Sequence, residues 1–168
     1  MKFFFILLIL FMFNALSKEP QLSQYMMSLN NSNTIFKHNQ SSFHCYPYGI
    51  FTFDKLLNTK GLVKECKNSV NIFYRKNPQA KPFSRVHFKN YQFYHLDKVK
   101  GNCIIYSSGT KSYSEVLLEE GYAIYDFLLA DELWKYKFIR AQKRAQVLKK
   151  GIWKGWKLST SIVYEESI

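Results

Sequence analysis

The sequence predicts an α+β protein in which a small β-barrel is capped by helices. Three observations favour this class. The chain has 168 residues, which suits one domain. Its first part carries several short runs of β-type residues, and the region after residue 110 carries two segments with apolar side chains at helical spacing. Short strands followed by segregated helices are typical of α+β proteins.

The first part of the chain predicts short strands, one helix and their connections. Residues 18–30 are polar with few structural signals, so we expect a mobile lead-in. Residues 34–37 and 41–46 predict a hairpin, and residues 53–66 predict a helix with one apolar face. The other expected elements are strands over 70–74, 86–96 and 103–107, a loop over 76–84 that contains two prolines, and an extended segment over 122–125.

Two helices are expected near the C-terminus. Ser112 and Glu115 form a capping-box pattern, and Gly121 ends the short helix behind it. The last helix is expected over residues 131–150, with acids in its first turn and lysines in its last, as the helix dipole favours. Its expected inward stripe is Leu133, Phe138, Ala141, Ala145 and Leu148.

Composition excludes several classes of protein. Aromatic residues make up 18% of the chain and charged residues only 21%, so it can bury a core and is not disordered. The net charge of +12 favours anionic partners such as nucleic acid or lipid headgroups. However, most cations are lysine, and the accompanying abundance of Phe, Tyr, Ile and Asn equally fits AT-rich codons. The charge therefore has a functional and a compositional interpretation.

The N-terminus resembles an export signal. Residues 3–13 form an apolar run behind Lys2, and small residues suit cleavage after Ser17. The run is shorter than the roughly 20 residues that span a bilayer. We therefore expect a signal peptide at 1–17, a lead-in at 18–30, a domain at 31–157 and a tail at 158–168, with a periplasmic or secreted location and no membrane span in the mature chain.

An oxidising compartment allows the cysteines to pair. Cys45, Cys66 and Cys103 permit three different single disulfides, each leaving one free thiol. Their spacing, and that of the histidines, fits no zinc motif, so no metal site is predicted.

Three motifs resemble the thermonuclease (staphylococcal nuclease-like) family. Asp97-Lys98 resembles the start of its Asp-Lys/Arg-Tyr-Gly-Arg turn, and residues 114–123 resemble its N-E-x-L-x-x-x-G-x-A helix. Ala141, Ala145 and the Gly-Ile-Trp of residues 151–153 resemble its closing motif. More faintly, residues 31–35 and 44–48 resemble its Asp-Gly-Asp-Thr-Ile and Ile-Asp-Thr-Pro-Glu segments. The resemblance implies a five-stranded OB-type barrel with about three helices.

The same resemblance argues against the family's activity. The family hydrolyses phosphodiesters with one calcium ion, a glutamate base and two arginines. The positions that would carry these roles hold Asn31, Asn33, Cys45, Tyr46 and Tyr48, with Gln40 and Gly101 at the arginine positions. No Asp or Glu occurs between Glu19 and Asp54, so a shifted register restores no carboxylate cluster. Hard cations need such oxygens, so no catalytic residue, metal or other cofactor is expected. Calcium belongs only to the alternative of a weak or altered nuclease in which Lys100 replaces an arginine.

Two binding functions remain open. One is docking to another envelope protein through a cleft that Tyr46 and Tyr48 have made aromatic and uncharged. The other is nucleic-acid binding by cations interleaved with aromatic residues. The candidate cations are Arg75, Lys76, Lys81, Arg85, Lys89 and Lys100.

Overall fold

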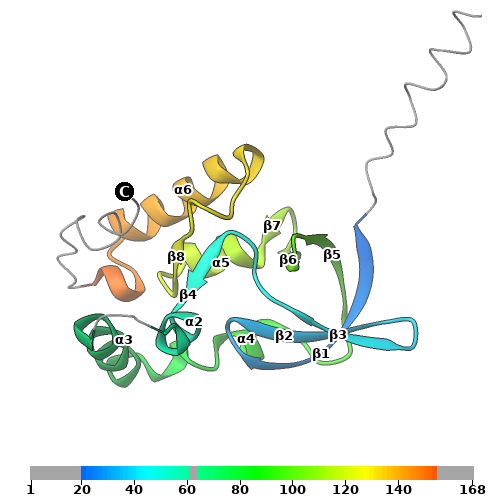
Figure 1. The fold of residues 1–168 in the computed structure, drawn as a ribbon, viewed down its shortest axis with the longest axis horizontal. Helices are drawn as coiled ribbons and strands as arrows, with labels where there is room; N and C mark the ends of the chain where they lie inside the picture. The colour runs from blue at the N-terminus through cyan, green and yellow to red at the C-terminus, as the bar shows by residue number, and fades with distance from the viewer. Residues whose placement is uncertain (1–19, 61–63, 155–168) are drawn as a thin grey trace, which may run out of the picture.

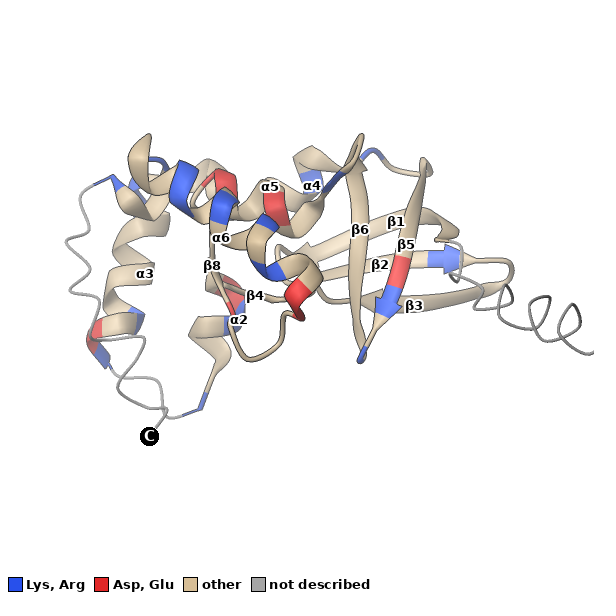
Figure 2. Ribbon diagram, turned by 90° about the horizontal axis from the view of Figure 1, so that it is seen from above, with Lys and Arg blue, Asp and Glu red and all other residues tan. Residues whose placement is uncertain are grey.

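The computed structural model describes residues 20–60 and 64–154, which form an α+β fold. Five strands and a two-residue strand make one antiparallel sheet in the order β3-β2-β1-β5-β6-β7. Its strands are β1 (Gln21–Asn30), β2 (Asn33–His38), β3 (Ser41–Cys45), β5 (Phe93–Val99), β6 (Asn102–Ser108) and β7 (Lys111–Ser112). The short strands β4 (Ile50–Thr52) and β8 (Ala123–Tyr125) pair separately. The sheet lies at one end of the molecule, and most of the helices lie at the other (Figures 1 and 2).

The expected lead-in is wrong where the structure describes it. Residues 21–30 are β1, which pairs with β2 on one side and β5 on the other. The usual strand signal is inverted, because Ser23 and Ser28 face the interior while Leu22 and Met27 are about half exposed. Register shifts within β1 further interrupt the alternation. The folded domain therefore begins before residue 31. The expected signal peptide and tail lie outside the described residues.

The middle of the chain is more helical than expected. The helix expected over 53–66 is two helices, α2 (Phe53–Asn58) and α3 (Lys64–Lys76), with residues 61–63 between them outside the described residues. The strand expected over 70–74 is wrong, because this segment belongs to α3. Its buried residues Val70, Phe73 and Tyr74 have helical spacing.

The expected loop over 76–84 contains a short 3-10 helix, η1 (Pro78–Ala80). The strand expected over 86–96 is wrong in its first half, because α4 (Phe83–His87) precedes it and β5 begins only at Phe93. Between them the backbone turns at Tyr91, whose φ is 63°. The hairpin β2–β3 and the strand over 103–107 are confirmed. The extended segment expected over 122–125 is confirmed as β8.

The C-terminal helices are confirmed with one correction. Helix α5 (Tyr113–Glu119) begins with the predicted capping box of Ser112 and Glu115. Helix α6 (Glu132–Val147) is capped by Asp131 and followed by η2 (Gly151–Trp153). Leu133 and Leu148 do not belong to the buried stripe of α6, since they are 71% and 55% exposed. Trp134 is buried instead, and its ring stacks on that of Phe138.

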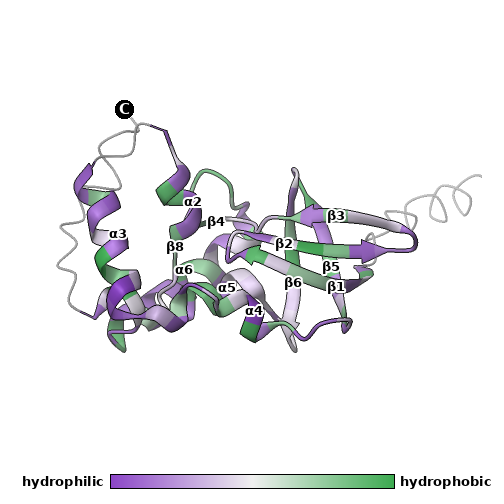
Figure 3. Cartoon of the chain, turned by 90° about the horizontal axis from the view of Figure 1, so that it is seen from below, coloured by the Kyte–Doolittle hydropathy of each residue, from purple (hydrophilic) through white to green (hydrophobic). Residues whose placement is uncertain are grey.

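Two apolar clusters hold these elements together. The larger lies between the sheet, α4, α5 and α6 and contains Tyr25, Phe36, Phe88 and Tyr113. The smaller joins α2, α3 and η2 around Phe53 and Phe73. In Figure 3 the helices carry apolar residues on some faces and polar residues on others. No helix among residues 20–60 and 64–154 is long and apolar enough to cross a membrane.

A disulfide joins Cys45 at the end of β3 to Cys103 in β6, and Cys66 is free. Beside the disulfide, the Cys103 N–H donates to the Tyr46 carbonyl at 2.7 Å, and the Tyr48 N–H donates to the Cys103 carbonyl at 3.0 Å. Residues 46–48 therefore run alongside β6, with Pro47 and Cys103 in a parallel bridge.

Replacing Cys45 and Cys103 by alanine together should lower the free energy of unfolding by about 2–4 kcal/mol, because the disulfide closes a long loop of the unfolded chain. Urea unfolding under oxidising conditions measures the loss. Cys66→Ala is the matched control and should leave the midpoint nearly unchanged. A double variant as stable as the parent would contradict the assignment of this disulfide.

Candidate ligand-binding site

A cleft of about 390 Å³ lies where the base of the β2–β3 hairpin meets β4, α2 and the start of β6. We call it the amide pocket, because four asparagines line it. Its lining residues are Asn30, Ser32, Asn33, Tyr46, Pro47, Ile50, Thr52, Lys55, Asn58, Thr59 and Asn102. Lys55 is the only charged residue of this set, and its ammonium group lies over the Phe51 ring.

The two asparagines on the hairpin side are held in place by their side-chain oxygens. The Oδ1 of Asn30 accepts hydrogen bonds from the backbone N–H and hydroxyl of Ser32 at 2.9 and 2.7 Å. The Oδ1 of Asn33 lies 2.9 Å from Nδ1 of His44. No hydrogen bond among the described residues uses the Nδ2 groups of Asn30 and Asn33. These two amides therefore offer N–H donors.

The other two asparagines are held by their nitrogens. Nδ2 of Asn58 donates to the Asp54 carbonyl at 2.9 Å, and Nδ2 of Asn102 donates to the Lys100 carbonyl at 3.1 Å. Within the described residues, their Oδ1 atoms accept no hydrogen bond. The pocket thus carries amide donors on the hairpin side, and amide acceptors on α2 and β6.

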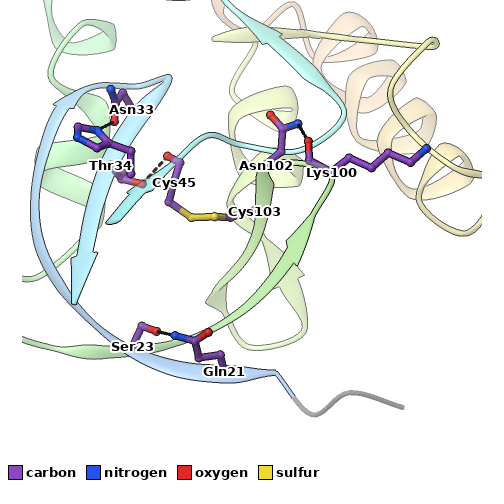
Figure 4. Close-up of a disulfide and its surroundings, with 9 residues drawn as sticks. Gln21, Ser23, Asn33, Thr34, Cys45, Lys100, Asn102 and Cys103 are labelled. Atoms are coloured by element: carbon purple, nitrogen blue, oxygen red, sulfur yellow. Dashed lines mark hydrogen bonds between the residues drawn. A yellow bond between two sulfur atoms is a disulfide. The ribbon is translucent and has the colours of Figure 1, made fainter. Parts of the chain in front are cut away.

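Tyr46 also lines the pocket. Its side chain is 43% exposed and its ring is nearly parallel to that of His44, with the centroids 6.4 Å apart. The disulfide between β3 and β6 and the bonded backbone of residues 46–48 fix the chain on both sides of this ring. Figure 4 shows the Cys45–Cys103 bridge with Asn33 on one side and Asn102 on the other.

Of the residues aligned with catalytic positions, only Asn33 and Tyr46 line this pocket. Tyr48 is fully buried, and its hydroxyl accepts a hydrogen bond from the Asp131 N–H at 3.0 Å. Burial raises the pKa of Tyr48. The expected aromatic cleft is therefore corrected: Tyr48 supports the core and presents no surface to a partner.

Asn31 is also buried and connects the sheet to the helical end. Its side chain donates to the Ala80 carbonyl at 2.7 Å and accepts from the Ser84 N–H at 2.9 Å. Its backbone N–H donates to Oδ2 of Asp54 at 3.0 Å. The Asp54 carboxylate that the fold brings to this region is thus buried beneath Asn31 and does not line the amide pocket.

The expected arginine positions do not reach the pocket either. Gln40 lies at the tip of the β2–β3 hairpin, at the end opposite the base that lines the pocket. Gly101 follows Lys100 in the β5–β6 turn, where both residues have positive φ. Lys100 contributes its backbone carbonyl to the placement of Asn102, and neither residue is in the lining.

The candidate cations do not form one surface. Arg75 and Lys81 share a second cleft, of about 820 Å³, with Tyr74 and two asparagines. The Arg85 side chain is bound to the carbonyls of Ser28 and Leu29, each at 3.0 Å. Lys76 and Lys89 are exposed and line neither cleft.

The described residues contain no group of three or more His, Cys, Asp or Glu side chains that could hold a metal ion. What the amide pocket can do is exchange hydrogen bonds with an uncharged polar ligand and place a ring against it. The sequence interpretation missed Asn30, Lys55, Asn58 and Asn102. Asparagine is common in turns and helix ends, so no pattern marks these residues until the fold brings them together.

The buried Asp54 should make stability depend on pH. Burial raises the pKa of its carboxyl, so the protonated form is favoured in the folded chain. The wild type should therefore lose stability as the pH rises through this raised pKa. Asp54→Asn keeps an acceptor oxygen but does not titrate. Its unfolding free energy relative to the wild type should rise from acid to neutral pH, as measured by urea titrations across that range. If the unfolding free energy of Asp54→Asn falls relative to that of the wild type from acid to neutral pH, the raised pKa of Asp54 is contradicted.

Comparison with protein-family models and with curated proteins finds no match to this chain.

Proposed function

We propose that this chain is an exported, non-catalytic binding module of the thermonuclease-like OB type. It docks to another protein of the cell envelope through the amide pocket. The observation that carries the proposal is the lining of the pocket, which is rich in amides and hydroxyls, includes an exposed tyrosine and has one charged side chain.

The strand arrangement supports the OB-type part of the proposal. In an OB fold five strands form a partly open barrel. Here β3, β2, β1, β5 and β6 are consecutive neighbours in the sheet. The backbone bonds and disulfide at Cys103 bring the chain after β3 back to β6. That return is what a barrel of these five strands requires.

The pocket chemistry supports binding without hydrolysis. In the family, carboxylates hold calcium and a glutamate activates water. Asn33, at one of the aspartate positions, and Tyr48, at the glutamate position, have neutral side chains. A neutral side chain does not supply the negative charge with which a carboxylate binds calcium. Loss of one catalytic group typically costs about two to three decades of rate. Loss of the carboxylates, the glutamate base and the arginines together should leave almost no hydrolysis. Binding of a ligand is therefore the function that this pocket supports best.

The same lining favours a protein partner. Centres of protein interfaces are poor in charge and rich in tyrosine. The paired amide donors and acceptors match the N–H and C=O groups of a polypeptide segment. Lys55 alone would give a weak site for a phosphate backbone, which is bound through several cations.

Tyr46→Ala should abolish capture of the partner in pull-downs from envelope extract, because it removes the exposed ring of the pocket. Tyr91→Ala is the matched control, since Tyr91 is 67% exposed and lies outside the pocket. It should retain capture. Equal capture by both variants, or loss by both, would contradict docking at the amide pocket. A Tyr48→Asp variant is unsuitable for this test, because it places a charge in the core.

Nucleic-acid binding is the second candidate, favoured by the shared cleft of Arg75 and Lys81. If a single strand binds there, Arg75→Ala combined with Lys81→Ala should reduce the salt dependence of log K by about 0.7 for each cation removed. Fluorescence anisotropy with a labelled oligonucleotide measures this slope. Affinity that does not change with salt would exclude this candidate.

The weak-nuclease alternative is separated from both by a plasmid digest with calcium, magnesium or manganese. We expect no cleavage by the purified protein. Cleavage that a chelator stops would support a metal-dependent nuclease and would contradict the proposed function.

A further inference from the structure

Helix α6 exposes large apolar side chains on the face opposite the core. Its inner face buries Trp134, Phe138, Ala141 and Ala145. On the outer side Leu133, Tyr136 and Val147 are 71%, 73% and 72% exposed, and Ile139 is 41% exposed. Positions 133, 136, 140, 143 and 147 follow one stripe of the helix, since their spacing alternates three and four residues.

Cations lie between these apolar side chains. A shallow groove of about 710 Å³ lies on this face. Its lining residues are Tyr136, Ile139, Arg140, Lys143, Arg144, Val147 and Leu148. The helix carries five Lys or Arg residues against one acid, Glu132, which pairs with Lys135 at 3.1 Å. Arg144 lies 3.5 Å from Glu119, whereas no ion pair involves Arg140 or Lys143 among the described residues.

In Figure 1, α6 lies along the outside of the helical end of the molecule. The apolar and cationic side chains therefore form one elongated surface, which spans about 24 Å along the 16 residues of the helix.

We propose that this outer face of α6 binds the surface of an anionic membrane. Lys and Arg attract acidic headgroups, and apolar side chains between them enter the boundary with the acyl chains. Large apolar side chains that gather on one exposed face are typical of surfaces that bind a partner or a membrane. A bilayer fits better than an acidic peptide, because exposed apolar side chains lie on both sides of the cations along the helix. Leu133 and Tyr136 precede Arg140 and Lys143, and Val147 follows them. This proposal is independent of the amide pocket and would place a pocket-bound partner at the membrane.

The test is co-sedimentation with lipid vesicles. It uses the chain from Lys18 onward, which signal cleavage would leave, because the apolar run of residues 3–13 would itself bind lipid. We expect binding to vesicles that contain phosphatidylglycerol and little binding to pure phosphatidylcholine. Arg140→Glu with Lys143→Glu should weaken binding more than about tenfold. Lys60→Glu with Lys64→Glu, an equal charge change outside α6, should keep most of it.

A second variant separates membrane binding from charge attraction alone. Tyr136→Ser with Val147→Ser leaves every cation in place and should also weaken vesicle binding. Circular dichroism confirms that each variant is folded. Three outcomes would overturn the proposal: no binding of the parent to anionic vesicles, equal losses in the α6 and control charge variants, or an unchanged serine variant. Binding to polyglutamate but not to vesicles would assign the face to an acidic polypeptide and would also overturn it.

Discussion

The linkage of β3 to β6 at Cys103 determines the course of the chain from the β2–β3 hairpin to the pocket and the core. One covalent bond and two backbone hydrogen bonds meet at this residue. They bring the chain that follows the β2–β3 hairpin to β6, which lies several strands away from β3 in the sheet order. Because residues 46–48 are fixed on β6, Tyr46 faces the amide pocket while Tyr48 enters the core. Cys45 therefore has a structural role in the fold.

A second junction connects the sheet to the helices. Asn31 binds η1 and α4 through its side chain, and α2 through the carboxylate of Asp54. An unmade hydrogen bond at a buried group costs about 1–3 kcal/mol, so each of these contacts restricts where the helices can sit. This restriction places Lys55 and Asn58 of α2 beside the hairpin. The polar pocket is therefore a consequence of a polar junction in the core.

The sequence predicted the α+β class, the β2–β3 hairpin, the capping box and the course of α6, because these depend on local chemistry. It did not predict β1, where serines face inward and leucines face outward, nor the helical state of Val70 to Tyr74, whose β-branched and aromatic residues resemble a strand. It identified Asn33 and Tyr46 through family motifs. It could not find Asn58 or Asn102, since only tertiary contacts bring α2 and β6 to the hairpin.

The proposed function requires that the amide pocket binds its partner without a metal ion. Calorimetric titration of the folded chain with calcium tests it most directly. We expect no saturable heat, because no carboxylate lines the pocket and its one charged residue is Lys55. Saturable binding of one calcium ion per chain, lost on replacing Asn33 by alanine, would contradict it.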